Sequence, residues 1–323
     1  MPDPILKVRG LNKVFQLRKR NALMATQSLY AVNDISFDLG ENEVMGVVGE
    51  SGCGKSTLGR LILRLIEPTS GDIEFMGQDV RRLSKGELRR VRSRMQMVFQ
   101  DPSGSLNPNM SVGDAIAETL RFHGVASASE RRSRVVRMLD TVGLSEGHYD
   151  RLPHQLSGGQ NQRVGIARAL IINPKLVVMD EAVSALDVSV QTQILKLLEG
   201  IRKEFPVSII FISHDLSVVR RVSNRVVVLY MGRIMETGPA QDIFADAHHP
   251  YTKGLLASHP SIDPDAPLPA SLVLKGDLPS ALNKPAGCPF VTRCEKATEL
   301  CGQRIPELRG IGSGRSIACH NVC

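Results

Sequence analysis

The chain has 323 residues, of which 42% are apolar and 23% charged, a composition that predicts a globular protein with one large core or two smaller domains. Its longest apolar runs, at 226–230 and 209–212, are far too short to cross a bilayer. Asp3 and Pro4 interrupt the start of the chain, so we expect no leader peptide, which would have a basic segment followed by an apolar one. A formal net charge of +7 could indicate nucleic acid, but the basic residues are spread along expected helices with no aromatic platform among them. We therefore expect a cytosolic protein that does not bind nucleic acid.

Short strands dominate the start of the chain. Residues 5–15 and 30–48 are predicted strands, separated by a polar loop at the basic insertion 18–21. The end of the second segment, 44–48, is a buried strand that leads into a glycine-rich loop, and a helix at 56–66 follows.

The rest of the chain alternates strands and helices around an insertion. Residues 101–155 have a helical, loop-rich pattern without clear strands, and the proline-rich stretch 260–269 precedes a tail with little periodicity. The other predicted strand segments are 70–80, 95–99, 176–179, 208–212 and 225–230, and the other predicted helices are 81–94 and 190–205. This order predicts a parallel α/β core that a helical insertion interrupts.

The glycine-rich loop fits the phosphate-binding pattern G-x-x-x-x-G-K-[ST] in the strand-to-helix context that the pattern requires. Its glycines free backbone N–H groups to surround phosphates, and Lys55 supplies a positive charge at the β and γ oxygens. Ser56 can place its hydroxyl on Mg²⁺, and Thr57 can reach the α-phosphate. The eight residues of the pattern are Gly49, Glu50, Ser51, Gly52, Cys53, Gly54, Lys55 and Ser56.

Two carboxylates end the apolar strand at 176–179. Asp180 fits a role at Mg²⁺, because this hard cation prefers oxygen ligands and retains water. Glu181 follows directly. The alternative is an acidic pair at a strand end that solvent satisfies.

A second glycine-containing segment lies further along the chain. Ser157 can cap a helix predicted at 160–172, and such a helix directs free N–H groups and its positive dipole end at an anion. Adjacent glycines let a backbone approach a phosphate closely. The segment is Leu156, Ser157, Gly158, Gly159 and Gln160.

LSGGQ is the signature of the ATP-binding-cassette (ABC) ATPases, which this chain closely resembles. The resemblance implies that Glu181 is the general base or the water-orienting carboxylate, that His214 contacts the γ-phosphate, and that Gln100 senses Mg²⁺ and the attacking water. It also implies that Phe15 stacks on adenine, with Tyr30 as the alternative, although either ring could belong to the core. The loop that crosses the dimer interface in the family corresponds to Ser184, Ala185, Leu186 and Asp187.

Two positions depart from the family pattern. Ala182 stands where close relatives usually have proline, and Asn161 stands where an arginine often follows the signature glutamine. Neither change removes a phosphate, metal or water contact, so we expect activity to survive.

The resemblance further implies head-to-tail pairing, in which the signature of one subunit closes over the ATP that its partner binds. The chain has one copy of each motif and is therefore expected to be half of an ATPase pair, with a heterodimer favoured over a homodimer. ABC ATPases that act on nucleic acid usually carry two cassettes or long coiled coils, which are absent here. Transport across a membrane is thus the favoured task.

The tail narrows the resemblance. The run His248, His249, Pro250, Tyr251 and the segment 276–280 are similar to the C-terminal extension of oligopeptide and dipeptide import ATPases, and the second ATPase subunit of dipeptide importers is the nearest match. This implies two permease subunits, an external solute-binding protein and a peripheral location on the cytosolic face of the membrane. The transported solute stays open among dipeptides, oligopeptides, glutathione, nickel chelates and opines. The histidine run itself is more simply explained as a turn with packed rings.

Cysteines crowd the last segment, which in a cytosolic chain favours metal over disulfides. Zinc ribbons use pairs two to four residues apart, and no such pair occurs among the cysteines at 288, 294, 301 and 319. Four thiolates on a Pro/Gly-rich loop suit a [4Fe–4S] cluster, which similar import ATPases carry, while zinc and unligated or disulfide thiols stay open. The four candidate ligands are Cys288, Cys294, Cys301 and Cys319, with Cys323 as the spare.

The predicted architecture is an α/β P-loop NTPase (RecA-like) core with an antiparallel β subdomain, a helical ABC insertion and a loop-rich C-terminal extension. We expect an ATPase domain at 1–257, with its helical subdomain at about 101–165, and the extension at 258–323. The expected ligands are ATP, Mg²⁺ and the iron–sulfur cluster.

Overall fold

The computed structural model describes residues 3–17, 27–102, 104–125, 127–258, 279–280, 282 and 286–321. The predicted loop insertion at 18–21 and the proline-rich stretch 260–269 lie outside these residues. Two compact units divide the chain. The phosphate-loop unit comprises Pro4–Leu39, Met45–Arg81 and the chain from His214 onward, and the helical unit comprises Gly40–Val44 and Arg82–Ser213.

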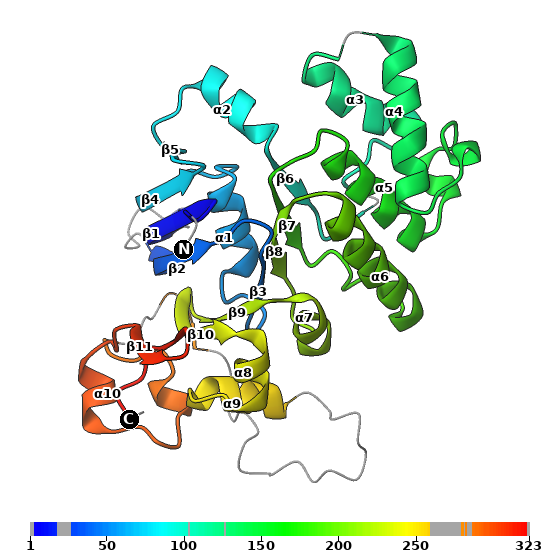
Figure 1. The fold of residues 1–323 in the computed structure, drawn as a ribbon. Helices are drawn as coiled ribbons and strands as arrows, with labels where there is room; N and C mark the ends of the chain where they lie inside the picture. Colours follow the sequence, from blue (N-terminus) through cyan, green and yellow to red (C-terminus); the bar gives the residue numbers. More distant parts are fainter. Residues whose placement is uncertain are drawn as a thin grey trace. The chain divides into compact units, whose positions relative to one another are not determined.

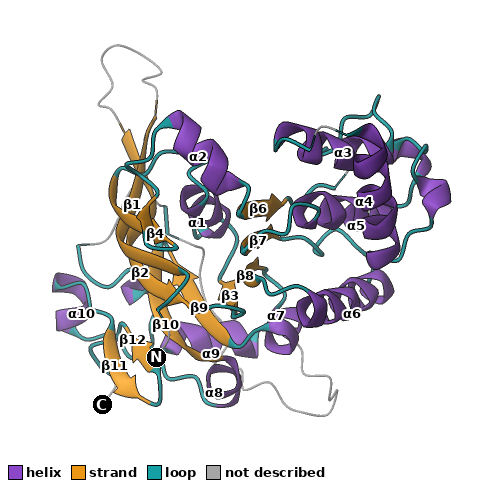
Figure 2. Ribbon diagram, turned by 45° about the horizontal axis from the view of Figure 1, so that its top comes forward, coloured by secondary structure: helices purple, strands orange, loops and turns teal. Residues whose placement is uncertain are grey.

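The phosphate-loop unit contains an antiparallel sheet with the strand order β2-β1-β4-β5. Figure 2 shows its strands β1, β2 and β4 in orange. Alternate residues of these strands are buried, as expected for a sheet with one face on the core. The strands are β1 (Leu6–Leu17), β2 (Gln27–Leu39), β4 (Ser70–Phe75) and β5 (Gln78–Asp79).

A second group of strands in this unit has the order β11-β12-β10-β9-β3. The pair β3–β9 is parallel and the other pairs are antiparallel. Two-residue turns with both φ values positive close three hairpins of the unit, at Met76–Gly77, Met231–Gly232 and Ser313–Gly314. These strands are β3 (Val44–Val48), β9 (Arg225–Tyr230), β10 (Arg233–Pro239), β11 (Arg309–Gly312) and β12 (Arg315–Ile317).

Short helices complete the phosphate-loop unit (Figure 1). They are α1 (Lys55–Ile62), α7 (Leu216–Val222), α8 (Ala240–Ala245), α9 (Pro250–Ala257), the 3₁₀ turn Val291–Arg293 and α10 (Glu299–Gln303).

The helical unit holds three parallel strands in the order β8-β7-β6. Every residue of β7 and β8 is buried, which explains their continuous apolar sequences. The strands are β6 (Met95–Val98), β7 (Leu176–Asp180) and β8 (Ser208–Ile212).

Helices α3, α4 and α5 pack together in this unit, as Figure 1 shows. Four of its helices begin at a serine whose hydroxyl accepts a backbone N–H three residues on, namely Ser84, Ser111, Ser127 and Ser157. The helices are α2 (Lys85–Arg92), α3 (Val112–Phe122), α4 (Ala128–Thr141), α5 (Gly158–Leu170) and α6 (Val188–Glu204), with 3₁₀ turns at Glu146–His148 and Pro153–Gln155.

One prediction of secondary structure is wrong, and one feature of the tail was not predicted. The segment 30–48 is not one strand, because the chain turns at Gly40–Asn42, where Asn42 has φ 57°, and separates β2 from β3. The tail contains the β11–β12 hairpin and α10 although its sequence shows little periodicity. Among the described residues, no helix is long and apolar enough to span a membrane.

Candidate functional site

The predicted phosphate loop connects β3 to α1 with glycines in conformations that other residues rarely adopt. Gly49 and Gly54 have φ values of 151° and 104°. A Cβ on Gly49 would lie 2.2 Å from the carbonyl oxygen of Leu229, and a Cβ on Gly54 would lie 2.1 Å from that of Ala31. Both positions therefore require glycine, and the backbone is fixed in shape by β9 and β2.

Lys55 is only 4% exposed and its ammonium group lies against its own loop. Its Nζ donates to the carbonyl oxygens of Gly49 at 2.8 Å and Glu50 at 3.0 Å. Burial raises the pKa of the neighbouring Cys53 thiol, although the charge of Lys55 opposes this, so Cys53 stays a neutral thiol. The positive charge of the loop is thus held ready for an anion.

Helix α1 begins differently from the serine-capped helices. Its N-cap is Gly54, no side chain caps it, and its first turn contains no acidic residue. The positive end of a helix dipole without such partners is a favourable position for a phosphate.

In the helical unit, the structure brings Glu181 and Gln100 together. Asp180 ends β7 and is 2% exposed, and Glu181 follows it with a positive φ of 48°, which its N–H bond to the carbonyl of Ile212 at 2.9 Å supports. The Gln100 amide Nε2 donates to Oε2 of Glu181 at 2.8 Å. Positive φ is uncommon outside glycine and marks a backbone that the surrounding structure holds in place.

The segment 184–187 is anchored to this site. Ser184 Oγ donates to the Glu181 carbonyl at 2.9 Å, and the Gln191 amide donates to the carbonyls of Val183 and Leu186, both at 3.0 Å. The next residue, Asp187, is the N-cap of α6. The loop is therefore fixed at Glu181 on one side and at α6 on the other.

The LSGGQ segment forms the start of α5, and the predicted capping role of Ser157 is confirmed. Ser157 Oγ accepts the N–H of Gln160 at 3.3 Å, while Gln160 Oε1 accepts the N–H of Ser157 at 3.0 Å. A Cβ on Gly158 would lie 3.5 Å from Leu186, and one on Gly159 would lie 2.5 Å from Val190. The signature helix thus packs against the 184–187 loop and the start of α6.

The two departures from the family pattern lie inside the helical unit. Ala182 is 3% exposed, and the Asn161 amide nitrogen donates to the Pro153 carbonyl at 3.0 Å. Both side chains therefore contribute to packing.

His214 and the two aromatic candidates belong to the phosphate-loop unit. His214 is exposed and directly precedes Asp215, which caps α7. Val14 pairs with Tyr30 and Phe15 pairs with Leu29, so Phe15 and Tyr30 lie on neighbouring rungs but point to opposite faces of the ribbon. Lys13 Nζ lies 4.8 Å from the centre of the Phe15 ring.

The four described tail cysteines lie within electrostatic range of one another. Burial, with contributions from the other three thiols, raises the pKa of Cys288 to about 11, and burial also raises the pKa of Cys294. Cys301 differs: burial acts to raise its pKa, but hydrogen bonds involving Thr298 and Asn321 lower it.

The arrangement does not support the predicted [4Fe–4S] site, which also involved Cys319. Among the described residues, no three His, Cys, Asp or Glu side chains converge as metal ligands. Cys288 is buried with its proton favoured, and the Cys301 sulfur makes hydrogen bonds with Thr298 and Asn321.

Sequence reasoning missed a set of tail contacts on the phosphate loop. Arg293 donates to both carboxylate oxygens of Glu50, at 2.8 and 3.1 Å, and Tyr251 Oη accepts the Glu50 N–H at 3.0 Å. No local signal could have revealed them, because 243 and 201 positions separate the partners.

A buried carboxylate organises the histidine run. Glu236 is 0% exposed and accepts the N–H groups of His248 at 2.8 Å and His249 at 3.0 Å, together with Arg315 Nη2 at 3.1 Å. His249 Nδ1 in turn accepts the N–H of Tyr251 at the start of α9. The run packs as the simpler interpretation predicts.

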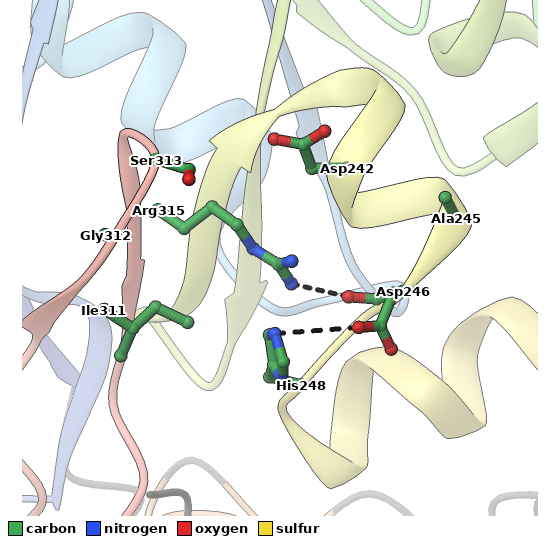
Figure 3. Close-up of a pocket in the computed structure, with 8 residues that line it drawn as sticks. All are labelled: Asp242, Ala245, Asp246, His248, Ile311, Gly312, Ser313 and Arg315. Carbon is green, nitrogen blue, oxygen red and sulfur yellow. Dashed lines mark hydrogen bonds and ion pairs between the residues drawn. The ribbon is translucent and has the colours of Figure 1, made fainter.

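A pocket of about 370 Å³ lies beside this network, between α8 and the β11–β12 hairpin (Figure 3). Arg315 and His248 both point toward Asp246 there: Arg315 donates to its main-chain carbonyl, and His248 Nε2 lies 3.8 Å from its carboxylate. It contains none of the predicted nucleotide-binding residues.

Comparison with known proteins decides the family. Residues 32–184 match the family described as ABC transporter, and residues 235–301 match the family described as oligopeptide/dipeptide transporter, C-terminal region. The oligopeptide transport ATP-binding protein OppF of Haemophilus influenzae is 45% identical over 322 residues, which cover 98% of this chain and 97% of OppF. The chain belongs to the ABC transporter ATP-binding proteins.

Other relatives of this ABC subunit have similar names. The oligopeptide transport ATP-binding protein AppF of Bacillus subtilis is 45% identical over 320 residues, covering 98% of this chain and 97% of AppF. The di/tripeptide transport ATP-binding protein DppF of Pseudomonas aeruginosa is 44% identical over 320 residues, covering 99% of this chain and 98% of DppF.

Solved structures agree with the fold. The cassette MJ0796, solved as a dimer in a post-hydrolysis state with ADP and Pi, matches with a TM-score of 0.65 and 28% identity over 73% of this chain and 98% of its own. The protein cbiO1 of Clostridium perfringens, part of an ABC transporter complex, matches with a TM-score of 0.65 and 32% identity over 76% of this chain and 92% of its own. The predicted P-loop NTPase fold is confirmed, and this ABC subunit is an ATP-binding ATPase of that family.

Proposed function

We propose that this ABC subunit powers the import of dipeptides or oligopeptides across the cytoplasmic membrane, on whose cytosolic face it sits as a peripheral protein. The observation that carries the proposal is the match of residues 235–301 to the C-terminal region of oligopeptide and dipeptide transporters. The proposed assembly contains a second ATPase chain, two permease subunits and an external solute-binding protein.

In the proposed reaction, Glu181 orients a water molecule and accepts its proton as the water oxygen attacks the γ-phosphorus of ATP. The bond between the γ-phosphorus and the β,γ-bridging oxygen breaks, and ADP and inorganic phosphate leave. The positive φ of Glu181 and the hydrogen bond from Gln100 support this role, because phosphoryl transfer depends mainly on positioning. His214 is proposed to contact the γ-phosphate.

The metal proposed to accompany ATP is Mg²⁺, held by Ser56, Gln100 and Asp180. These residues supply a hydroxyl, an amide and a carboxylate oxygen, which are the ligand types that Mg²⁺ prefers. When bound, the metal neutralises charge on the β- and γ-phosphates. Lys55 and the backbone of 49–57 hold the same phosphates, and Phe15, with Tyr30 as the alternative, stacks on adenine.

We further propose that the signature residues 156–160 and the loop 184–187 act on ATP bound by the partner ATPase, and that two ATP molecules close the pair. The packing of Gly158 against Leu186 supports the proposal that these two segments move together as one rigid part. Closure upon ATP binding and opening after hydrolysis would couple the nucleotide cycle to the permeases. The proposed boundaries are 1–257 for the ATPase domain, with 101–165 as its helical subdomain, and 258–323 for the extension.

A [4Fe–4S] cluster on Cys288, Cys294, Cys301 and Cys319 is proposed as a structural or regulatory group. The spacing of the four cysteines on one segment is the ground for it, whereas the raised pKa values of Cys288 and Cys294 oppose it, because a cluster ligand must be a thiolate. Binding requires the sulfurs to converge and to lose their protons. Anaerobic purification with iron, sulfide and zinc assays tests the proposal, and a colourless protein free of iron would refute it.

Reconstitution tests the transport proposal. The chain is purified with its permeases and second ATPase, placed in proteoliposomes with the solute-binding protein, and supplied with labelled dipeptide, oligopeptide, glutathione or nickel chelate. ATP-dependent uptake of peptides is expected. Uptake of only another solute would reassign the substrate while leaving the ATPase intact.

Glu181→Gln provides the matched catalytic test, since it retains the size and the hydrogen-bonding oxygen of the side chain but not the base. We expect ATP binding to persist, turnover to fall by at least about a hundredfold, and a closed dimer to accumulate. Turnover at the wild-type rate would remove Glu181 from the proposed role.

A further inference from the structure

The second residue of the phosphate loop, Glu50, is held at three of its groups. Its carbonyl oxygen accepts Lys55 Nζ at 3.0 Å, its N–H donates to Tyr251 Oη at 3.0 Å, and its carboxylate accepts both Arg293 bonds. Two of these three attachments come from the C-terminal part of the chain, and one comes from inside the loop.

Arg293 is placed for this contact by the cysteine-bearing segment. It ends the 3₁₀ turn Val291–Arg293, between Cys288 and Cys294, and its N–H donates to the Phe290 carbonyl at 3.1 Å. The turn is tied back to α10 because the Cys288 N–H donates to the Cys301 carbonyl at 2.7 Å. The Arg293 side chain is 7% exposed, so solvent screens the ion pair little.

Aromatic packing holds the same arrangement in place. The Phe290 ring lies 5.4 Å from the rings of both Tyr230 and Tyr251, and the Arg293 guanidinium lies 5.9 Å from the Tyr230 ring. Tyr230 Oη also accepts a bond from Arg293 at 3.4 Å. The cysteine segment and α9 thus both contact Glu50, and Tyr230 at the end of β9 packs against the residues that make these contacts.

We propose that Arg293 and Tyr251 are positioning residues for nucleotide binding: they fix Glu50, and the geometry of the segment 288–301 therefore sets the affinity of the phosphate loop for ATP. The rigid shape of the loop matters because its N–H groups must point at phosphate without reorganising. Coupling between two sites is reciprocal, so ATP binding also stabilises the backbone of 288–301.

The test measures Mg-ATP affinity of the full-length chain with a fluorescent ATP analogue, well below its unfolding temperature. Arg293→Gln and Glu50→Gln are each expected to raise Kd by about fivefold or more, the effect of weakening one charge-assisted contact. The Kd of the double variant is expected to be no higher than that of either single variant, because each substitution alone already removes the ion pair between Glu50 and Arg293. Arg304→Gln is the matched control, an exposed arginine of the same tail.

Two further measurements separate positioning from general stability. Tyr251→Phe keeps the buried ring but removes the acceptor of the Glu50 N–H, and it is expected to raise the Kd for ATP. Arg293→Lys keeps the positive charge and is expected to bind ATP more tightly than Arg293→Gln. Adding ATP is expected to slow hydrogen exchange of the backbone at 288–301 in the wild type but to leave it unchanged in Arg293→Gln. Unchanged Kd in Arg293→Gln despite a lower unfolding temperature, or additive effects in the double variant, would overturn the proposal.

Discussion

The buried carboxylate of Glu236 makes a quantitative prediction about the C-terminal part of the chain. Glu236→Gln keeps the volume of the side chain but removes its charge and one of its two acceptor oxygens. The amide nitrogen that replaces this oxygen must face a donor, either a backbone N–H of His248 or His249 or the Arg315 guanidinium. The substitution therefore loses one hydrogen bond and leaves a nearly buried cation without its carboxylate.

The expected loss of stability follows from these contacts. Removing one partner of a buried ion pair costs roughly 3–5 kcal/mol, and we expect about 3 kcal/mol here because the substituted amide retains one acceptor oxygen for a backbone N–H. For a protein of this size the apparent midpoint of thermal unfolding should fall by about 4–5 °C.

Thermal unfolding followed by circular dichroism measures the effect, and Glu307→Gln, at an exposed glutamate of the same tail, is the control. Faster hydrogen exchange at 248–258 and 309–317 should accompany the lower midpoint. A midpoint within about 1 °C of both wild type and control would refute the reasoning that Glu236 holds α9 and β12 together.

Three other predictions concern a histidine, the phosphate loop and a glycine. Burial lowers the pKa of His249 to about 4, although Glu236 acts to raise it, so below about pH 6.5 the unfolded chain binds a proton that the folded chain does not bind. The contribution of His249 to the free energy of unfolding should therefore be full above pH 6.5 and fall by roughly 3 kcal/mol toward pH 4. In unfolding titrations across that pH range, His249→Asn should flatten this slope. Lys55→Ala should weaken ATP binding by at least about tenfold in equilibrium titrations, and unchanged affinity would contradict the phosphate-loop assignment. Gly54→Ala should abolish nucleotide binding, because the added methyl group meets a backbone carbonyl of β2. At Gly52 an added methyl group meets nothing within 4 Å, so the Gly52→Ala variant should bind ATP more tightly than the Gly54→Ala variant in the same assay.

Local signals in the sequence predicted the parts of the site that local structure builds. The phosphate loop, the strand that ends at Asp180 and the serine cap of α5 each depend on residues a few positions apart, and the structure contains them where the pattern placed them. The β11–β12 hairpin was missed although Ser313–Gly314 is a typical turn pair, because neighbouring glycines hid the alternation of its short strands.

Contacts between distant segments could not be predicted from the pattern. The carboxylate of Glu50 and the guanidinium of Arg293 look like ordinary surface charges in the sequence, and only the packing of Phe290 against Tyr230 and Tyr251 brings them together. The four cysteines are a different case, since their spacing suggests a metal site but no three ligand side chains converge among the described residues.

The capping bond of Ser157 leaves its hydroxyl with a capacity that the helix does not use. A hydroxyl carries two lone pairs and one proton, and the bond from Gln160 occupies a lone pair, so the proton is available in another direction. The same oxygen can therefore stabilise α5 and donate to an anion at once, and its orientation is set before any anion arrives. Ser157→Ala would remove both the cap and the donor, whereas Ser157→Thr would keep both. Comparing the two variants therefore tells whether position 157 requires a hydroxyl group or only a small side chain.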